Sequence, residues 1–329
     1  MRPLRTPPLP GGMREITLTT TNNQLLLRPS REVNRAILGV IAKAQMGLPQ
    51  LRLHAFAFVS NHYHMLVSAE TSETIARFAQ FINCNITIKL NKINERSGTT
   101  WAHRYRGIDV SADEATQVWR LRYLLAHGVK ENLVARVDDW PGCTSIPWLR
   151  DGVDLWGVWT NHTKKGDAQR RKSYVEVAGK FDSRVQVQLT VLPCWANMPT
   201  TAWRKCVRDI IAEIEREADD KREATGSRPL GAAAILAAAP HTRLPHKPRR
   251  PAPLAHAPLA ELRQLRQRRA TLHMLHRAAS LEFSAGNWEA RFPDGMFRPF
   301  GGFVEAPISA LLSNEEGAYL APPLESVAP

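Results

Sequence analysis

Apolar and polar positions along the first 130 residues follow the periods of strands and helices in turn. Four segments have the alternation or the apolar runs expected of strands: residues 15–20, 51–59, 62–69 and 104–110. Between them, apolar residues recur every three or four positions, which predicts one helix capped by Ser30 and another that starts at Ser72 or Thr74. The resulting order is strand, helix, two strands, helix, strand.

This order of elements is typical of the ferredoxin-like fold. We therefore expect the α+β class, with a ferredoxin-like βαββαβ core in which an antiparallel sheet has helices on one face. Two further helical patterns, at 202–221 and 259–284, predict a mainly helical C-terminal extension. Asn22 and Asn23 are common turn residues, and they predict a hairpin that joins the first strand to residues 24–27.

The strand at 62–69 begins with a pair of histidines. Residues 59–67 have the sequence VSNHYHMLV, so one bulky apolar residue separates His62 from His64. Successive side chains on a strand point to opposite faces, so the two imidazoles project together while Tyr63 points toward the core. Two histidines on a rigid strand supply half of a divalent-metal site. The alternative is a pair of unrelated strand histidines.

A third candidate ligand lies on the helix predicted for residues 112–127. Acidic residues favour the start of this helix, and Gly128 is a plausible C-terminal stop. Trp119, Tyr123 and His127 follow one another at intervals of four residues, on a different face from the apolar stripe. One rigid element could therefore offer a nucleophile and a metal ligand. The alternative is that Tyr123 is a half-buried packing residue and His127 a polar helix end.

Charge favours a polyanionic partner. The 329 residues include 44 lysines and arginines against 31 acidic residues, a net charge of +13. Each phosphate that a basic protein neutralises releases counterions, so nucleic acid is the leading partner, and a basic surface that binds nothing is the alternative. The four cysteines show no Cys-x-x-Cys spacing, which predicts reduced thiols. No apolar stretch reaches the ~18 residues of a membrane span.

Two segments together carry a family resemblance. SNHYHMLV and the later RYLLAHGVKENLVARVDDWPG resemble the IS200-like transposases, the single-tyrosine (Y1) HUH nucleases. Within that family, the chain looks closest to the chromosomal branch related to REP-associated tyrosine transposases. The resemblance covers residues 13–145 and includes a Trp-x-x-Arg-Tyr turn at 101–105 and an Asp-Trp-Pro end. That branch usually has Asn-Pro where this chain has His127-Gly128-Val129.

The resemblance implies a metal-dependent transesterase that cleaves and rejoins single-stranded DNA, with strand transfer of the transposase kind. By motif position, His62 and His64 would hold Mg²⁺ or Mn²⁺, and Tyr123 would become joined to the 5′-phosphate. His127, four residues after the tyrosine, would be the third ligand. The implied substrate is single-stranded DNA containing a hairpin, and the implied location is the cytoplasm, at the nucleoid. The sequence leaves open whether the protein is a monomer or a homodimer. It also leaves open whether the tyrosine acts in its own subunit or in the partner subunit.

Basic residues alternate with aromatic ones just before the tyrosine helix. Arg104 and Arg106 flank Tyr105, and Trp101 is nearby. This composition suits binding to the backbone and bases of single-stranded nucleic acid. The alternative is that Trp101 and Tyr105 only pack at the sheet edge. His54, by contrast, is expected to be structural.

The composition divides the chain into five parts. They are a disordered arm at 1–12, the nuclease-like domain at 13–147, a mixed and helical accessory region at 148–225, a Pro/Ala-rich basic linker at 226–260, and a helix with a tail at 261–329.

Three rival functions stay open at this point. A domesticated transposase could bind DNA without cleaving it, and a metal-dependent nuclease could activate water and need no tyrosine. The third rival is a structural protein whose histidines are accidental.

Overall fold

The structure is a computed structural model that describes residues 6–171, 175, 177, 179–245, 253–294 and 296. Parts of the predicted arm, linker and tail lie outside these residues. Along the described part of the chain, no helix has the length and apolar content needed to cross a membrane. All four cysteines are free thiols.

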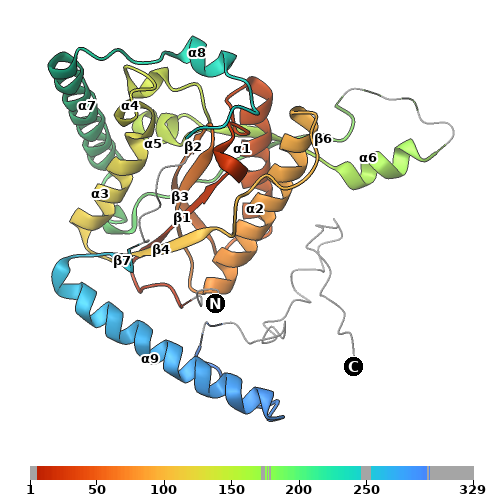
Figure 1. Ribbon diagram of the computed structural model, residues 1–329, viewed down its shortest axis with the longest axis vertical. Coiled ribbons are helices and arrows are strands. Elements are labelled where there is room, and N and C mark those ends of the chain that lie inside the picture. Colours follow the sequence, from red (N-terminus) through yellow and green to blue (C-terminus); the bar gives the residue numbers. More distant parts are fainter. Residues whose placement is uncertain are drawn as a thin grey trace.

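The predicted ferredoxin-like core is present (Figure 1). Its elements are β1 (Met13–Thr19), α1 (Arg31–Met46), β2 (Arg52–Val59), β3 (His62–Ser68), α2 (Ser72–Ile93) and β4 (Arg106–Val110). The strands pair antiparallel in the order β2-β3-β1-β4, so β3 and β1 are central. This confirms the α+β class and the βαββαβ order. A two-residue strand, β7 (Ala255–His256), adds to the sheet parallel to β4.

The rest of the described chain is mainly helical. The helices are α3 (Glu114–Leu125), α4 (His127–Lys130), α5 (Ile146–Asp151), α6 (His162–Gln169), α7 (Thr200–Thr225), α8 (Ala232–Ala237) and α9 (Leu259–Ser284). Three short 3₁₀ turns lie at Thr21–Asn23, Val137–Asp139 and Pro193–Trp195. A separate two-stranded ribbon pairs β5 (Trp156–Thr160) with β6 (Asp182–Gln186).

The sheet is buried on both faces. The α1 and α2 helices cover one face, where the core includes Phe56 and Tyr63. The other face lies beneath α3, α4, α5 and α7, and its core includes Leu66, Leu121 and Val207 (Figure 1). The prediction that Tyr63 points into a core is therefore confirmed, and the C-terminal extension supplies part of the second core.

Polar side chains begin the helices where the sequence indicated. The Ser30 hydroxyl accepts the Val33 N–H at the start of α1, as predicted. Thr71 does the same for α2, one residue before its first residue, Ser72. Asp113 caps α3 by accepting the N–H of Thr116. Each cap satisfies a backbone donor that the first helical turn leaves without a partner.

Two local predictions are wrong. Residues 24–27 form no strand, because Asn22 and Asn23 lie in a 3₁₀ turn and β1 pairs instead with the remote strands β3 and β4. Gly128 does not stop the predicted helix at 112–127: α3 already ends at Leu125, so Tyr123 and His127 lie on successive helices, and Gly128 lies inside α4. A Cβ there would be 3.0 Å from the Val134 side chain, so Gly128 allows close packing. Asn132, with φ of 55°, follows α4 in the left-handed region.

The ribbon is fixed to the core by a close backbone contact. A Cβ on Gly39 of α1 would lie 2.1 Å from the Val158 carbonyl oxygen, and one on Gly157 would lie 2.0 Å from the Gly39 nitrogen. Only residues without a Cβ permit this approach. The pair therefore lets β5 pack directly on α1.

His54 is structural, as expected. Its ring is 1% exposed and links β2 to the segment that precedes α7. The Nδ1–H donates to the Val191 carbonyl over 2.8 Å, and Nε2 lies 2.8 Å from the Ser68 hydroxyl. Burial lowers the pKa of His54 to about 4.

Acid is expected to destabilise the fold through His54. Between pH 6.5 and 4 the unfolded chain binds a proton at His54 that the folded chain does not, so the free energy of unfolding falls as pH falls. By pH 5 the loss is roughly 2 kcal/mol. Urea unfolding at pH 7 and pH 5 measures it. A His54→Gln variant should have a lower free energy of unfolding at pH 7, and the fall in that free energy between pH 7 and pH 5 should be about 2 kcal/mol smaller than in wild type. An equal fall in both proteins would show that His54 does not cause the acid sensitivity.

Candidate metal centre and tyrosine

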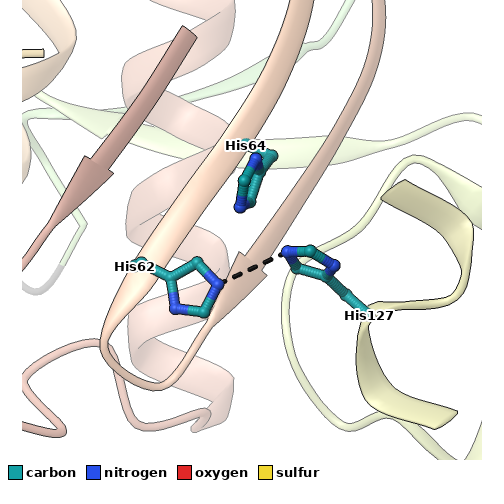
Figure 2. Close-up of side chains that lie close together, drawn as sticks. All are labelled: His62, His64 and His127. Carbon is teal, nitrogen blue, oxygen red and sulfur yellow. Dashed lines mark hydrogen bonds between the residues drawn. The ribbon is translucent and has the colours of Figure 1, made fainter. Parts of the chain in front are cut away.

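Three histidines from two distant segments converge beneath α3 and α4. His62 and His64 come from β3, and His127 is the first residue of α4 (Figure 2). One ring nitrogen of each lies within 4.8 Å of the others. His62 Nε2 and His127 Nε2 are 3.4 Å apart, and the His64 and His127 ring centroids are 4.3 Å apart. The cluster could hold a metal ion.

Strand register puts the first two imidazoles on one face. His64 lies opposite Thr17 of β1 and Ala57 of β2, and His62 lies opposite Thr19 and Val59. Directly opposed residues in an antiparallel sheet point to the same face. The methyl side chain of Ala57 therefore leaves room beside the imidazole of His64.

Hydrogen bonds at Nδ1 orient two of the rings. Asn61 Oδ1 lies 2.7 Å from His62 Nδ1, and Glu15 Oε1 lies 2.7 Å from His64 Nδ1. Each acceptor holds the proton on Nδ1 and leaves the Nε2 lone pair for an ion, the usual outer-shell arrangement of metal-bound histidine. The buried Nδ1 of His127 has no partner among the described residues.

The electrostatics also suit a metal ion. Burial lowers the pKa of His62 to about 3, helped by the charges of His64 and Lys130. Burial likewise lowers the pKa of His64 and brings the pKa of His127 well below its ordinary value. All three imidazoles are therefore neutral at pH 7, which is the form that binds metal. The residues present fit a divalent ion.

Glu15 lies at this site, and the sequence did not reveal it. It lies on β1, is 2% exposed, and accepts hydrogen bonds from three side chains. Besides His64, these are Arg120, whose Nη2 lies 2.6 Å from both carboxylate oxygens, and His256, whose Nε2 lies 3.1 Å from Oε2. Burial alone would raise the pKa of Glu15, but these partners hold it well below its usual range. The sole feature of the sequence that could have pointed to Glu15 is that an acidic residue lies on a predicted strand.

Tyr123 lies beside the histidines of its own chain. Its ring centroid is 4.9 Å from that of His127 and 5.6 Å from that of His64. The Arg120 guanidinium carbon lies 4.2 Å and the Lys130 Nζ 3.3 Å from the Tyr123 ring centroid. Burial raises the pKa of Tyr123, and the Arg120 charge opposes that rise. A single copy of the chain therefore holds the complete set of predicted catalytic and metal-binding residues.

The four predicted DNA-binding residues are not all gathered around the histidines. Trp101 packs on the α2 side, where its indole N–H donates to the Asn83 carbonyl and its ring meets Tyr63. Tyr105 contacts the same core, while Arg104 is exposed. Arg106 lies opposite Thr17, which places it on the histidine face. Trp101 and Tyr105 therefore both pack against the core, as in the alternative left open by the sequence.

The C-terminal extension reaches this site at two places. The α7 helix packs beside α3, where Arg122 pairs with Glu217 at 2.6 Å. The short β7 strand brings His256 to Glu15 and, at 5.7 Å between ring centroids, to Trp119. Nothing in the Pro-rich sequence around His256 indicated that this residue would contact Glu15 or Trp119.

Comparison with known proteins gives one structural similarity. No family model matches the sequence, and no curated protein does. Among solved structures, the chain is similar to one described as the REP-associated tyrosine transposase bound to a REP hairpin. The identity is 16% and the TM-score 0.34, over 44% of this chain and 82% of the other.

Proposed function

We propose that this protein is a metal-dependent transesterase that cleaves and rejoins single-stranded DNA, as the transposases it resembles in sequence motifs do. The observation that carries the proposal is the meeting of Tyr123 with three neutral histidines in one chain, of which His64 and His127 are buried and His62 is partly exposed. Cleaving a phosphodiester needs a nucleophile, charge neutralisation and in-line geometry. Tyr123 offers the nucleophile, Arg120, Lys130 and an ion held by the histidines offer the charge neutralisation, and the net charge of +13 favours the substrate.

In the proposed reaction the Tyr123 hydroxyl oxygen bonds to the scissile phosphorus while the bond from phosphorus to the 3′-oxygen breaks. The phenol loses its proton and the departing 3′-oxygen gains one, so the products are a 5′-phosphotyrosine and a free 3′-hydroxyl. The same hydroxyl can reverse the step, because one phosphodiester replaces another. Arg120 and Lys130, both against the Tyr123 ring, stabilise the developing phenolate.

His62, His64 and His127 would hold the divalent ion in this scheme. When bound, the ion polarises the scissile phosphate and neutralises its charge. Of the two ions expected from the resemblance, Mn²⁺ suits three imidazole nitrogens better than Mg²⁺, which prefers oxygen ligands. Glu15 and Asn61 keep the rings oriented through Nδ1.

The test is adduct formation by the full-length protein. Labelled single strands with a hairpin, and matched strands without one, are incubated with Mn²⁺, with Mg²⁺ or with EDTA and run on a denaturing gel. We expect a protein–DNA adduct that survives SDS, requires metal, is stronger with Mn²⁺ and maps by mass spectrometry to the peptide that contains Tyr123. Metal-dependent cleavage without an adduct would instead indicate a water-using nuclease. Binding with no cleavage of any strand would indicate a DNA-binding protein that does not cut.

A further inference from the structure

A cavity of about 210 Å³ opens directly beside Tyr123. One wall is formed by α3 and α4, with Trp119 and Tyr123, and the other by α7 of the C-terminal extension. Its apolar lining includes Val129, Ile214 and Ala218. Trp119 is 52% exposed, so its ring is accessible to a ligand. The cavity thus combines an apolar lining with an accessible ring, next to the proposed nucleophile.

Two buried polar atoms belong to residues that line this cavity. Arg222 uses Nη2 to contact the Ala135 carbonyl and Asp219, yet its Nη1 has no partner among the described residues. Asn132 donates to the Arg228 carbonyl, but its Oδ1 is likewise without a partner there. An unsatisfied buried donor and acceptor each cost free energy. One is a donor and the other an acceptor, the two kinds of group that read the edge of a nucleobase.

The charge around the cavity favours a phosphate-linked ligand. Arg122, Lys130, Lys221 and Arg222 line it, against the single acidic residue Glu217. Glu217 is itself paired with Arg122. The cavity has room for one planar heterocycle and is too small for a base pair, so duplex DNA does not fit it. A strand that presents its phosphate to Tyr123 would pass the opening of the cavity.

We propose that this cavity is a nucleobase pocket that takes one unpaired base of the DNA strand next to the scissile phosphate. The inference rests on the proposed function, because it makes α7 the element that positions and selects the nucleotide to be cut. The base lies against Trp119, its edge meets Arg222 and Asn132, and the surrounding cations hold the flanking phosphates. A base held in this way also fixes the register of the strand at Tyr123.

The test measures binding with the wild-type protein in EDTA, so that no cleavage is needed. Single-stranded 15-mers of mixed sequence contain 2-aminopurine at the centre, and a matched set has an abasic site there. We expect the emission of 2-aminopurine to fall on binding as it stacks on an aromatic ring, and the abasic strands to bind about tenfold more weakly. Ala218→Phe, which fills the cavity, should abolish both the emission change and the preference. Ala212→Phe, at an exposed position on the same helix, is the control and should retain both.

Three outcomes separate the possibilities. Equal affinity for base-containing and abasic strands would overturn the pocket, as would an Ala218→Phe protein that behaves like wild type. A loss of all DNA binding by Ala218→Phe, including binding of abasic strands, would also count against a base pocket and point to a damaged fold. A clear 2-aminopurine response in a protein that never forms a covalent adduct would support the pocket and reject the proposed chemistry.

Discussion

Replacing Tyr123 with phenylalanine is expected to abolish the covalent protein–DNA adduct and to lower the cleavage rate at least about a thousandfold. The substitution removes only the hydroxyl oxygen that we propose as the nucleophile, because phenylalanine keeps the ring that packs between His127, Arg120 and Lys130. The metal site should be unaffected, so Mn²⁺ binding measured by calorimetry should match that of wild type. The adduct is quantified on denaturing gels with the DNA and metal conditions that give the wild-type product.

Tyr105→Phe is the matched control for this experiment. Tyr105 also loses a hydroxyl in the change, but its ring contacts the core on the α1 and α2 side of the sheet, away from the histidines. Its variant should form the adduct at a rate close to wild type. Undiminished cleavage by Tyr123→Phe, with or without an adduct, would rule out this residue as the nucleophile.

The second large effect is expected from Glu15→Gln, which retains the shape of the side chain and removes its charge. Arg120 and Glu15 are both buried, and an amide in place of the carboxylate leaves the guanidinium without a counter-charge. Breaking a buried ion pair on one side costs about 3–5 kcal/mol. For a domain of this size that lowers the melting temperature by roughly 10 °C. His64 also loses its charged acceptor, so Mn²⁺ affinity should fall about 10- to 100-fold.

Thermal unfolding measures the loss of stability, and calorimetry measures the loss of Mn²⁺ affinity. Glu73→Gln offers a matched control, because Glu73 pairs with Arg77 one turn away on the more accessible surface of α2. Such a pair contributes less than about 1 kcal/mol, so that variant should melt within a few degrees of wild type. A Glu15→Gln protein as stable as the Glu73→Gln protein would show that Arg120 does not depend on the carboxylate.

The local features of the fold were predictable because they depend on short periods in the sequence. Apolar spacing predicted α1, α2 and α7, and the single residue between His62 and His64 placed both imidazoles on one face of β3. The four-residue intervals from Trp119 to His127 likewise predicted that these side chains would meet. Each of these inferences involves residues less than three helical turns apart.

The remaining features depend on pairings between remote segments, for which a single sequence carries no period. The hairpin at 24–27 was wrong because β1 finds its partners in β3 and β4, and nothing local to Asn22 reports that choice. Glu15 gave no sign of its role because Arg120 and His256 follow it by 105 and 241 residues. The cavity wall formed by α7 was unpredictable for the same reason.

The contact between Glu15 and His256 also has a consequence for the order in which the protein is made. A ribosome completes β1, the histidine strand and the tyrosine helix well before residue 256 is synthesised, and N-terminal regions generally fold first. A nascent or prematurely terminated chain would therefore carry the proposed nucleophile and all three histidines while Glu15 still lacks one of its partners. The hydrogen bond from His256 to Glu15 therefore forms only after residue 256 has been made, so a chain that stops before it has a less firmly held partner for His64.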